Sequence, residues 1–235
     1  MAVAAPFTGF SRDAIQFLGD LAEHNERSWF QPRKGEYERL LKEPLEALCR
    51  ALGERFEARR LPLRSDPVHS PFRIYRDVRF SADKSPYKTQ VSASFPWGGE
   101  GGGVGGYFHF QPGEMFAGGG MWHPEPAQLA AWRRLIDVDL PAVLAALQSP
   151  EFAGTFGEVS GDRLKRVPTG FASDHPGAEL LKLKDVTFGR RLSDDDVMSR
   201  DLPDMLADTF AAAVPVLRLL ASLAPGAQAP WLRGG

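Results

Sequence analysis

The sequence predicts an α+β fold, in which a central antiparallel sheet of two consecutive hairpins is packed on one face by N- and C-terminal helices. Apolar residues recur at helical spacing near both ends of the chain, and they alternate with polar residues between residues 72 and 95. A Pro-Gly turn signal at residues 112–113 divides a second alternating stretch. Helices on both sides of a central group of strands are typical of this class, and we expect one domain over residues 1–235.

The N-terminal part is predicted to be helical. A first helix should begin after Ser11, a good N-cap, and end near Asn25. A second helical stretch begins near Pro32, and Pro44 inside it should kink or divide it. Cys49 falls in the apolar register of this stretch, so we expect a buried structural thiol.

Two alternating arms, residues 72–80 and 88–95, are predicted to form the first hairpin around the loop "SADKSPY". The apolar face of the first arm carries Arg76, and a buried cation needs a carboxylate, which Asp83 or an acid of the first helical region, Glu23 or Glu26, could supply. A bulge would instead make Arg76 a candidate site residue. The two faces of the first arm are Phe72, Ile74, Arg76, Val78 and Phe80, against Arg73, Tyr75, Asp77 and Arg79.

The second hairpin is predicted in "YFHFQPGEMFAGGG". Its two faces are expected to carry Phe108 and Phe110 on one side, and Tyr107 and His109 on the other. Farther along, helices are predicted from Pro126, over "DLPAVLAALQS", and over residues 201–223, where Pro215 should bend the last one. Residues 160–191 are predicted to be irregular and basic, with a short helix after "DHPG".

Charge is distributed unevenly along the chain. The 28 Lys and Arg residues and the 30 Asp and Glu residues give a net charge of −2. Residues 59–91 nevertheless hold 8 basic and 3 acidic residues, and residues 160–191 hold 7 and 4. A nucleic-acid-binding domain is usually basic throughout, so these local clusters favour a small anionic ligand as partner, and nucleic acid is not expected.

The composition also bears on location. With 43% apolar residues a full-sized core can form, but no stretch approaches the roughly 20 consecutive apolar residues of a membrane helix, so no membrane partner is expected. The first residues lack the basic and apolar regions of a secretory signal, and the chain has one cysteine. We therefore expect a soluble, cytoplasmic protein.

Motifs for common cofactors are missing from the sequence. A GxGxxG match at Gly101, Gly103 and Gly106 is followed by "YFHF", a strand pattern, whereas dinucleotide binding needs a helix there. The chain contains no P-loop, no HExxH and no GxSxG motif. We expect neither a metal nor a cofactor.

Several segments carry a resemblance to a known family. "NERSWF", "FRIYRDVRFSADKSPYKT", "GGGMWHPEP", "LKRVPTGFASDHP" and "LLKLKD" occur in this order. In them the chain resembles the DUF2461 family over nearly its whole length. The resemblance implies a single domain and a soluble protein, and it supplies no catalytic residues, because no activity is established for the family. The chain departs from the family pattern at His24–Asn25, where two asparagines are common.

The candidate site is the polar face of the two hairpins, where guanidinium, ammonium and phenol groups could bind an anion. The expected ligand-binding residues are Arg73, Tyr75, Arg79, Lys84, Tyr87, Lys88, Tyr107 and Lys165. The expected general bases, if chemistry occurs, are His109 and Asp77. Lys165 belongs to the second basic segment, which is either a surface loop or a second wall of the site.

Other interpretations stay open. The polar face could be a solvated surface whose arginines pair with acids across strands, and Lys84 could serve the turn and not a ligand. The leading function is binding of a small phosphorylated ligand. The alternatives are a metal-independent enzyme acting on a phosphoryl or acyl substrate, and an interaction module for nucleic acid or protein.

Overall fold

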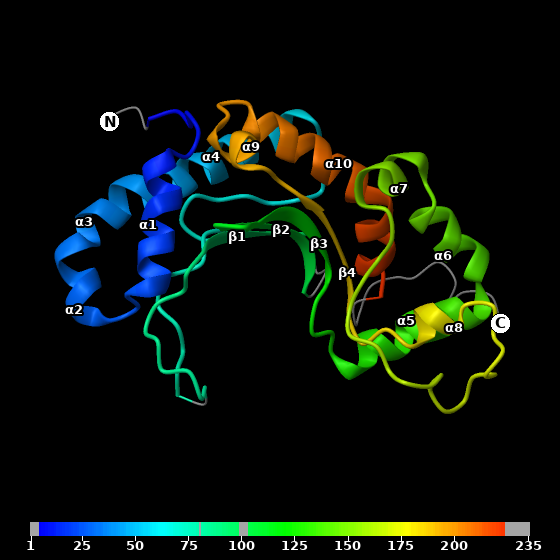
Figure 1. Ribbon diagram of the computed structural model, residues 1–235. Helices are drawn as coiled ribbons and strands as arrows, with labels where there is room; N and C mark the ends of the chain where they lie inside the picture. The colour runs from blue at the N-terminus through cyan, green and yellow to red at the C-terminus, as the bar shows by residue number, and fades with distance from the viewer. Residues whose placement is uncertain (1–4, 80, 99–102, 224–235) are drawn as a thin grey trace. The chain divides into compact units, whose positions relative to one another are not determined.

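Four strands form one antiparallel sheet in the order β1-β2-β3-β4, as the computed structural model shows for residues 5–79, 81–98 and 103–223 (Figure 1). The strands are β1 (Val91–Pro96), β2 (Val104–Gln111), β3 (Glu114–Met121) and β4 (Val186–Arg191). The turn between β2 and β3 falls at the predicted Pro-Gly pair, and Gly113 adopts a φ of +80° that favours glycine. The predicted α+β class with an antiparallel sheet is confirmed.

The first hairpin is present, but its first arm is not a regular strand. Lys88 N donates to Ile74 O (2.7 Å) and Phe72 N donates to Ser92 O (2.9 Å), so the two arms pair in the antiparallel sense. The isolated bridges Pro71↔Ala93 and Tyr75↔Tyr87 enclose three residues on the first arm and five on the second. Unequal arms cannot continue a ladder, so regular pairing fails here. Phe80, expected on the apolar face, lies outside the described residues.

Strand β4 corrects the expectation that residues 160–191 are irregular throughout. Val186 and Phe188 alternate with more exposed residues, as in a half-buried strand. The segment is short, and it includes a glycine and two arginines, which obscures the period-two pattern.

The N-terminal helices follow the predicted boundaries closely. The first, α1 (Arg12–Glu23), is capped by Ser11, whose Oγ accepts a hydrogen bond from Ala14 N (3.2 Å). The next stretch is divided into α2 (Arg27–Phe30), the 3₁₀ turn η1 (Gln31–Arg33), α3 (Lys34–Tyr37), the π-helical turn η2 (Glu38–Lys42) and α4 (Glu43–Ala58). Pro44 lies in the first turn of α4, directly after the π-helical turn, so the irregularity falls where the proline predicts it.

The remaining helices are α5 (Pro126–Val138), α6 (Leu140–Leu147), α7 (Pro150–Phe156), α8 (Ala178–Leu181), α9 (Asp194–Met198) and α10 (Leu202–Ala221). The helix predicted from Pro126 is confirmed, and Pro215 lies inside α10. In the described part of the chain, no helix is both long enough and apolar enough to cross a membrane.

The chain divides into two compact units. Unit 1 comprises Met1–Phe95, Tyr107–Ala117 and Arg191–Asp208, and unit 2 comprises Pro96–Gly106, Gly118–Arg190 and Thr209–Gly235. That residues 1–235 form a single domain stays a prediction. In unit 2, Trp132 and Phe152 are fully buried, and Phe152 packs edge-on against Phe188 of β4 with ring centroids 5.0 Å apart.

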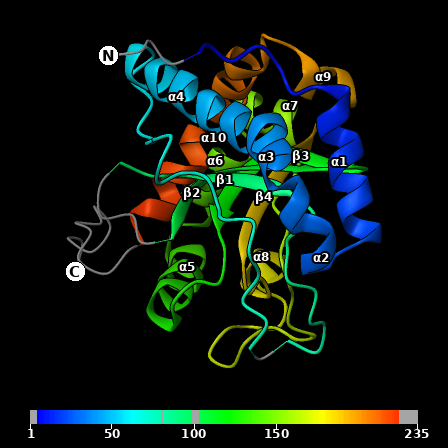
Figure 2. The ribbon, with the colours of Figure 1, turned by 90° about the vertical axis from the view of Figure 1, so that its left-hand side faces the viewer.

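The core of unit 1 lies between α4 and β1, which Figures 1 and 2 both show beside each other. Phe56 of α4 packs edge-on against Phe95 of β1, with ring centroids 5.7 Å apart. Cys49 of α4 is fully buried, as predicted, and burial raises the pKa of its thiol to about 12. A thiol with so high a pKa is a structural group and not a nucleophile.

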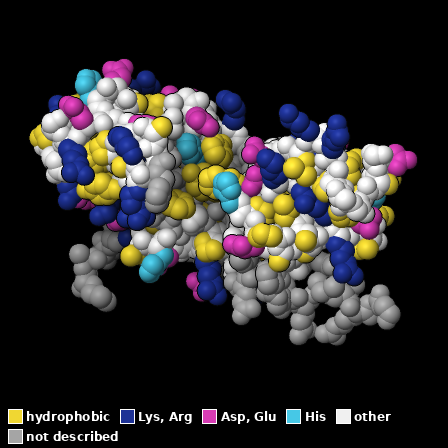
Figure 3. Space-filling view, turned by 90° about the horizontal axis from the view of Figure 1, so that it is seen from below, with side chains coloured by type: hydrophobic (Ala, Val, Ile, Leu, Met, Phe, Trp, Pro, Cys, Tyr) yellow, Lys and Arg dark blue, Asp and Glu magenta, His cyan; other side chains and the backbone are white. Residues whose placement is uncertain are grey.

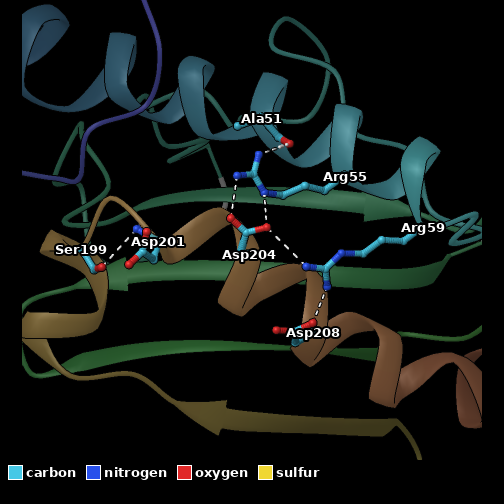
Figure 4. A network of polar contacts seen from close by, with 7 residues as sticks. All are labelled: Ala51, Arg55, Arg59, Ser199, Asp201, Asp204 and Asp208. Carbon is cyan, nitrogen blue, oxygen red and sulfur yellow. Dashed lines mark hydrogen bonds and ion pairs between the residues drawn. The ribbon is translucent and has the colours of Figure 1, made fainter.

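Charged side chains join α4 to the start of α10 (Figure 4). Arg55 donates from Nε and Nη2 to the two carboxylate oxygens of Asp204 (2.8 and 2.7 Å) and from Nη1 to Ala51 O (3.1 Å). Arg59 contacts Asp204 (3.3 Å) and forms a short ion pair with Asp208. We call these four charged residues the α4–α10 cluster. The hydrogen bond from Arg55 lowers the pKa of Asp204.

Candidate functional site

An open cleft of about 600 Å³ lies between the C-terminal end of α1 and the arms of the first hairpin. All of its lining residues belong to unit 1. They are Ala22, Asn25, Arg76, Asp77, Asp83, Ser85, Tyr87, Lys88, Thr89 and Gln90. Polar and charged residues predominate in this lining, which suits a polar ligand better than an apolar one.

The backbone of the second arm is fixed by Asn25. Its Nδ2 donates to Tyr87 O (2.9 Å), and its Oδ1 accepts from Tyr87 N (3.1 Å). The Tyr87 ring stacks on Phe30 with centroids 4.1 Å apart and is 1% exposed. The buried ring of Tyr87 does not favour its predicted role in orienting a ligand, although Tyr87 is among the lining residues of the cleft. The role of Asn25 was not predicted, although Asn25 opens the motif "NERSWF".

Arg76 forms an ion pair with Asp83, one of the partners that the sequence suggests. Its Nη1 donates to Asp83 Oδ2, and Asp83 Oδ1 accepts hydrogen bonds from Ser85 N (2.9 Å) and Ser85 Oγ (2.7 Å). The hydrogen bond from Arg76, followed by that from Ser85 Oγ, holds the pKa of Asp83 well below its usual range. The charge of Arg76 is thus matched by an acid of its own hairpin.

Asp77 and Arg79 also pair with each other. Arg79 Nη2 donates to Asp77 Oδ2 (2.7 Å), and this contact is the main reason that the pKa of Asp77 is lowered. A carboxylate with a lowered pKa is a weaker base, so the pairing disfavours Asp77 as a general base. Lys84, expected at the lip of the site, donates from Nζ to Val78 O (3.0 Å).

Lys88 and Arg73 differ from Arg76 and Arg79, each of which pairs with an acid of the hairpin. Among the residues that the structure describes, neither Lys88 nor Arg73 forms an ion pair with a carboxylate. Lys88 lines the cleft, and its Nζ lies 5.0 Å from the centre of the Phe72 ring. Burial, and secondly the positive charge of Arg73, lower the pKa of Lys88. The charge of Arg73 also contributes to the lowered pKa of Asp77, so Arg73 lies within electrostatic reach of one acid. Two cations are therefore near each other here, and among the described residues neither is engaged in an ion pair.

The polar side of β2 forms a second group of candidate residues. Tyr107 Oη lies 3.1 Å from His109 Nδ1, at hydrogen-bond distance, and the His109 ring stacks on Phe116 of β3 at 4.9 Å. His109 is only 8% exposed, and its Nε2 is buried without a hydrogen-bond partner among the described residues. Burial lowers the pKa of His109, so the imidazole is neutral near pH 7. His109 does not line the cleft.

The last two expected residues lie elsewhere. Tyr75 is 45% exposed and packs against Tyr87 at a tilt, with ring centroids 5.5 Å apart. Lys165 is exposed in unit 2 and is not a lining residue of the cleft, so its proposed role rests on the sequence alone.

Figure 3 shows Lys and Arg side chains mixed with hydrophobic ones on its left-hand part, where the N-terminal helices lie.

In the described part of the chain, no three His, Cys, Asp or Glu side chains are grouped so that they could hold a metal ion.

The chain matches no curated protein and no solved structure. A family model described as "Conserved hypothetical protein (DUF2461)" matches residues 13–218. The matched segment covers most of the chain and includes every residue that lines the cleft. The chain therefore belongs to the DUF2461 family, as its sequence motifs predict.

Proposed function

We propose that the protein binds a small phosphorylated ligand at the cleft, with Lys88 and Arg73 as the groups that bind the phosphate. The observation that carries this proposal is the pair of neighbouring cations that form no ion pair with a carboxylate among the described residues, one of them in the lining of the cleft. Arg76 and Arg79 have acids of their own hairpin as partners, so we expect them to contribute less.

The electrostatics of Lys88 support an anionic ligand. Its pKa is lowered because the ammonium group has lost water and because Arg73 repels it. A bound phosphate would supply hydrogen-bond acceptors to the ammonium group and would place negative charge between the two cations. Ligand binding should therefore raise the pKa of Lys88, and by linkage it should stabilise the folded chain.

The general bases expected from the sequence receive less support. Asp77 forms an ion pair with Arg79. His109 does not line the cleft: its Nδ1 contacts the Tyr107 hydroxyl, and its Nε2 is buried. We therefore propose binding and do not extend the proposal to a reaction. The expectations of a single domain and a cytoplasmic location go with this proposal and rest on the sequence.

The test is thermal unfolding and titration calorimetry with a panel of phosphorylated metabolites. A ligand present at 100 times its Kd should stabilise the protein by about 2.7 kcal/mol. Lys88→Met should weaken the binding by about 10-fold or more, because a charge-assisted hydrogen bond contributes roughly 1.5–3 kcal/mol.

Lys84→Met is the matched control, since Lys84 lies in the same hairpin but contacts a backbone carbonyl and does not line the cleft. It should leave the affinity within about 2-fold of wild type, because it removes only an exposed, solvent-screened charge outside the lining of the cleft. Equal losses in the two variants would indicate general charge attraction and would contradict the proposed site. A folded protein that no phosphorylated compound stabilises would contradict it as well.

A further inference from the structure

A strip of aromatic rings begins beside Lys88 and continues onto the sheet. Phe72 lies next to the Lys88 ammonium group, and its ring packs edge-on against Tyr107 of β2, with centroids 6.2 Å apart. Tyr107 in turn contacts Phe116 of β3, with centroids 5.8 Å apart. We call Phe72, Tyr107 and Phe116 the aromatic strip. All three residues belong to unit 1.

The strip is accessible at the end that lies beside the cations. Phe72 is 44% exposed, and Tyr107 and Phe116 are partly exposed. A large aromatic side chain that stays exposed beside a charged group gains little from folding, because its ring remains in water. Stacking with a planar ligand would bury this surface.

The orientation of the rings is set by the protein. The Tyr107 hydroxyl lies within hydrogen-bond distance of His109 Nδ1 (3.1 Å), and the His109 ring stacks on Phe116 with an interplanar angle of 14°. His109 is therefore a positioning residue, which fixes Tyr107 and Phe116 relative to each other. A ligand that stacks here meets rings that are already ordered, so the entropy cost of binding is small.

We infer that the ligand of the cleft carries a planar heteroaromatic ring together with its phosphate, as a ribonucleoside monophosphate does. The ring would stack on Phe72 and the exposed part of Tyr107, and the phosphate would lie between Lys88 and Arg73. This inference rests on the proposed function, because the same two cations bind the phosphate in both. Its basis is that the accessible Phe72 ring lies beside the Lys88 ammonium group, which forms no ion pair among the described residues.

The experiment compares two kinds of probe on the full-length protein by titration calorimetry. The first kind is AMP, GMP, CMP and UMP, and the second is ribose 5-phosphate, which has the phosphate and sugar but no base. At least one nucleotide should bind about 5-fold or more tightly than ribose 5-phosphate, since stacking of one base on an aromatic side chain is worth about 5- to 150-fold in affinity.

Substitutions of Phe72 separate the ring from the phosphate. Phe72→Leu keeps an apolar side chain but removes the aromatic face, and it should weaken nucleotide binding by about 5-fold or more while leaving ribose 5-phosphate binding unchanged. Phe72→Tyr keeps the ring and should retain the affinity for the nucleotide. Lys88→Met should weaken both kinds of probe, because it acts on the phosphate.

The outcomes distinguish the inference from the function on which it rests. If ribose 5-phosphate binds as tightly as all four nucleotides, and Phe72→Leu changes nothing, the aromatic part is wrong and the phosphate site stands. If neither kind of probe binds to the folded protein, both are wrong. If a single-stranded oligonucleotide binds far more tightly than the mononucleotides, with a steep loss of affinity as salt rises, a free nucleotide is not the ligand.

Discussion

Two groups of charged residues in unit 1 differ in whether their positive charges are paired with carboxylates. In the α4–α10 cluster, both guanidinium groups meet carboxylates, and Arg55 binds Asp204 with two parallel hydrogen bonds (Figure 4). At the cleft, Lys88 and Arg73 lie near each other, and neither forms an ion pair with a carboxylate in the part of the chain that the structure describes.

This difference offers a way to distinguish charged residues that stabilise the fold from charged residues that are available to bind a ligand. When a charged group is paired, the interaction with its partner offsets part of the hydration free energy that the group loses on folding. Removing one member of the pair leaves the other unpaired. A cation that is repelled by a second cation and has no ion pair gains little stabilisation from its charge, so a ligand is a more direct explanation for the charge of Lys88. Binding and stability should therefore respond to different substitutions in the two groups.

The largest effect on stability is expected where the fold fixes the cleft itself. Asn25→Ala removes both hydrogen bonds to the backbone of Tyr87 and should destabilise the protein by about 1–3 kcal/mol, because two partly buried backbone groups lose their partners. Urea unfolding measures this change.

Gln16→Ala is its control, since Gln16 lies on α1, the helix that precedes Asn25, and makes an exposed contact with Asp20 (2.7 Å). Its cost should stay below about 0.5 kcal/mol. If the two variants lose equal stability, Asn25 does not have the anchoring role that its geometry assigns to it. If Asn25→Ala also weakens ligand binding, the anchor and the site are coupled.

The next largest effect concerns the matched cluster. Arg55→Gln should cost about 1–2 kcal/mol in urea unfolding, since it breaks the paired contact with Asp204 and the bond to Ala51 O. Binding of phosphorylated ligands should not change. Arg50→Gln on the same helix, where no ion pair occurs among the described residues, should be nearly neutral. Loss of ligand affinity in Arg55→Gln would break the comparison between the two groups.

A smaller effect is expected from pH and His109. Burial lowers the pKa of His109 in the folded state, whereas the ordinary value of about 6.5 applies when the chain is unfolded. The unfolded chain therefore binds more protons as the pH falls through 6.5, so acidification destabilises the fold. Glu114, whose charge acts in the opposite direction, reduces this effect.

His109→Gln should weaken the dependence of the melting temperature on pH between 7 and 5, measured against wild type in the same buffers. An identical pH dependence in the two proteins would show that His109 is not buried as described. The variant should also change the affinity for nucleotides more than for ribose 5-phosphate, because His109 positions the aromatic strip.

The smallest change in stability is expected for Lys88→Met, within about 0.5 kcal/mol of wild type, although its effect on binding is the strongest. The substitution removes a cation that another cation repels and keeps the aliphatic part of the side chain against Phe72. Urea unfolding without ligand tests this directly. A loss above about 1 kcal/mol would mean that Lys88 has a structural role and would remove the contrast with Arg55.

Local signals in the sequence predicted much of the fold. Ser11 caps α1, the Pro-Gly pair forms the β2–β3 turn, and the short sequence separation of Arg76 and Asp83 places both in one hairpin. Each of these features depends on residues within a few positions of each other. Strand β4 was not predicted because only two buried apolar residues, Val186 and Phe188, mark the alternation within its six residues.

The site was predicted less completely, because its decisive contacts join distant residues. The Tyr87 backbone is held by Asn25, which is 62 positions away in the chain, and its buried ring stacks on Phe30. The sequence placed Tyr87 only in the loop between the two arms, as a residue expected to orient the ligand. The same holds for the aromatic strip, whose members come from the hairpin, β2 and β3. The basic excess of residues 59–91 was visible in the sequence, but which cations lack partners was not.

The contact between Asn25 and Tyr87 has a kinetic and entropic consequence for Lys88. Because Lys88 follows an anchored residue directly, its main chain is already ordered in the empty protein. Ordering one residue of a free loop costs roughly 1–2 kcal/mol, whereas immobilising a single side chain costs only about 0.5–1.5 kcal/mol. An arriving ligand thus meets a preformed ammonium donor, and association should proceed in one step without a preceding rearrangement of the hairpin.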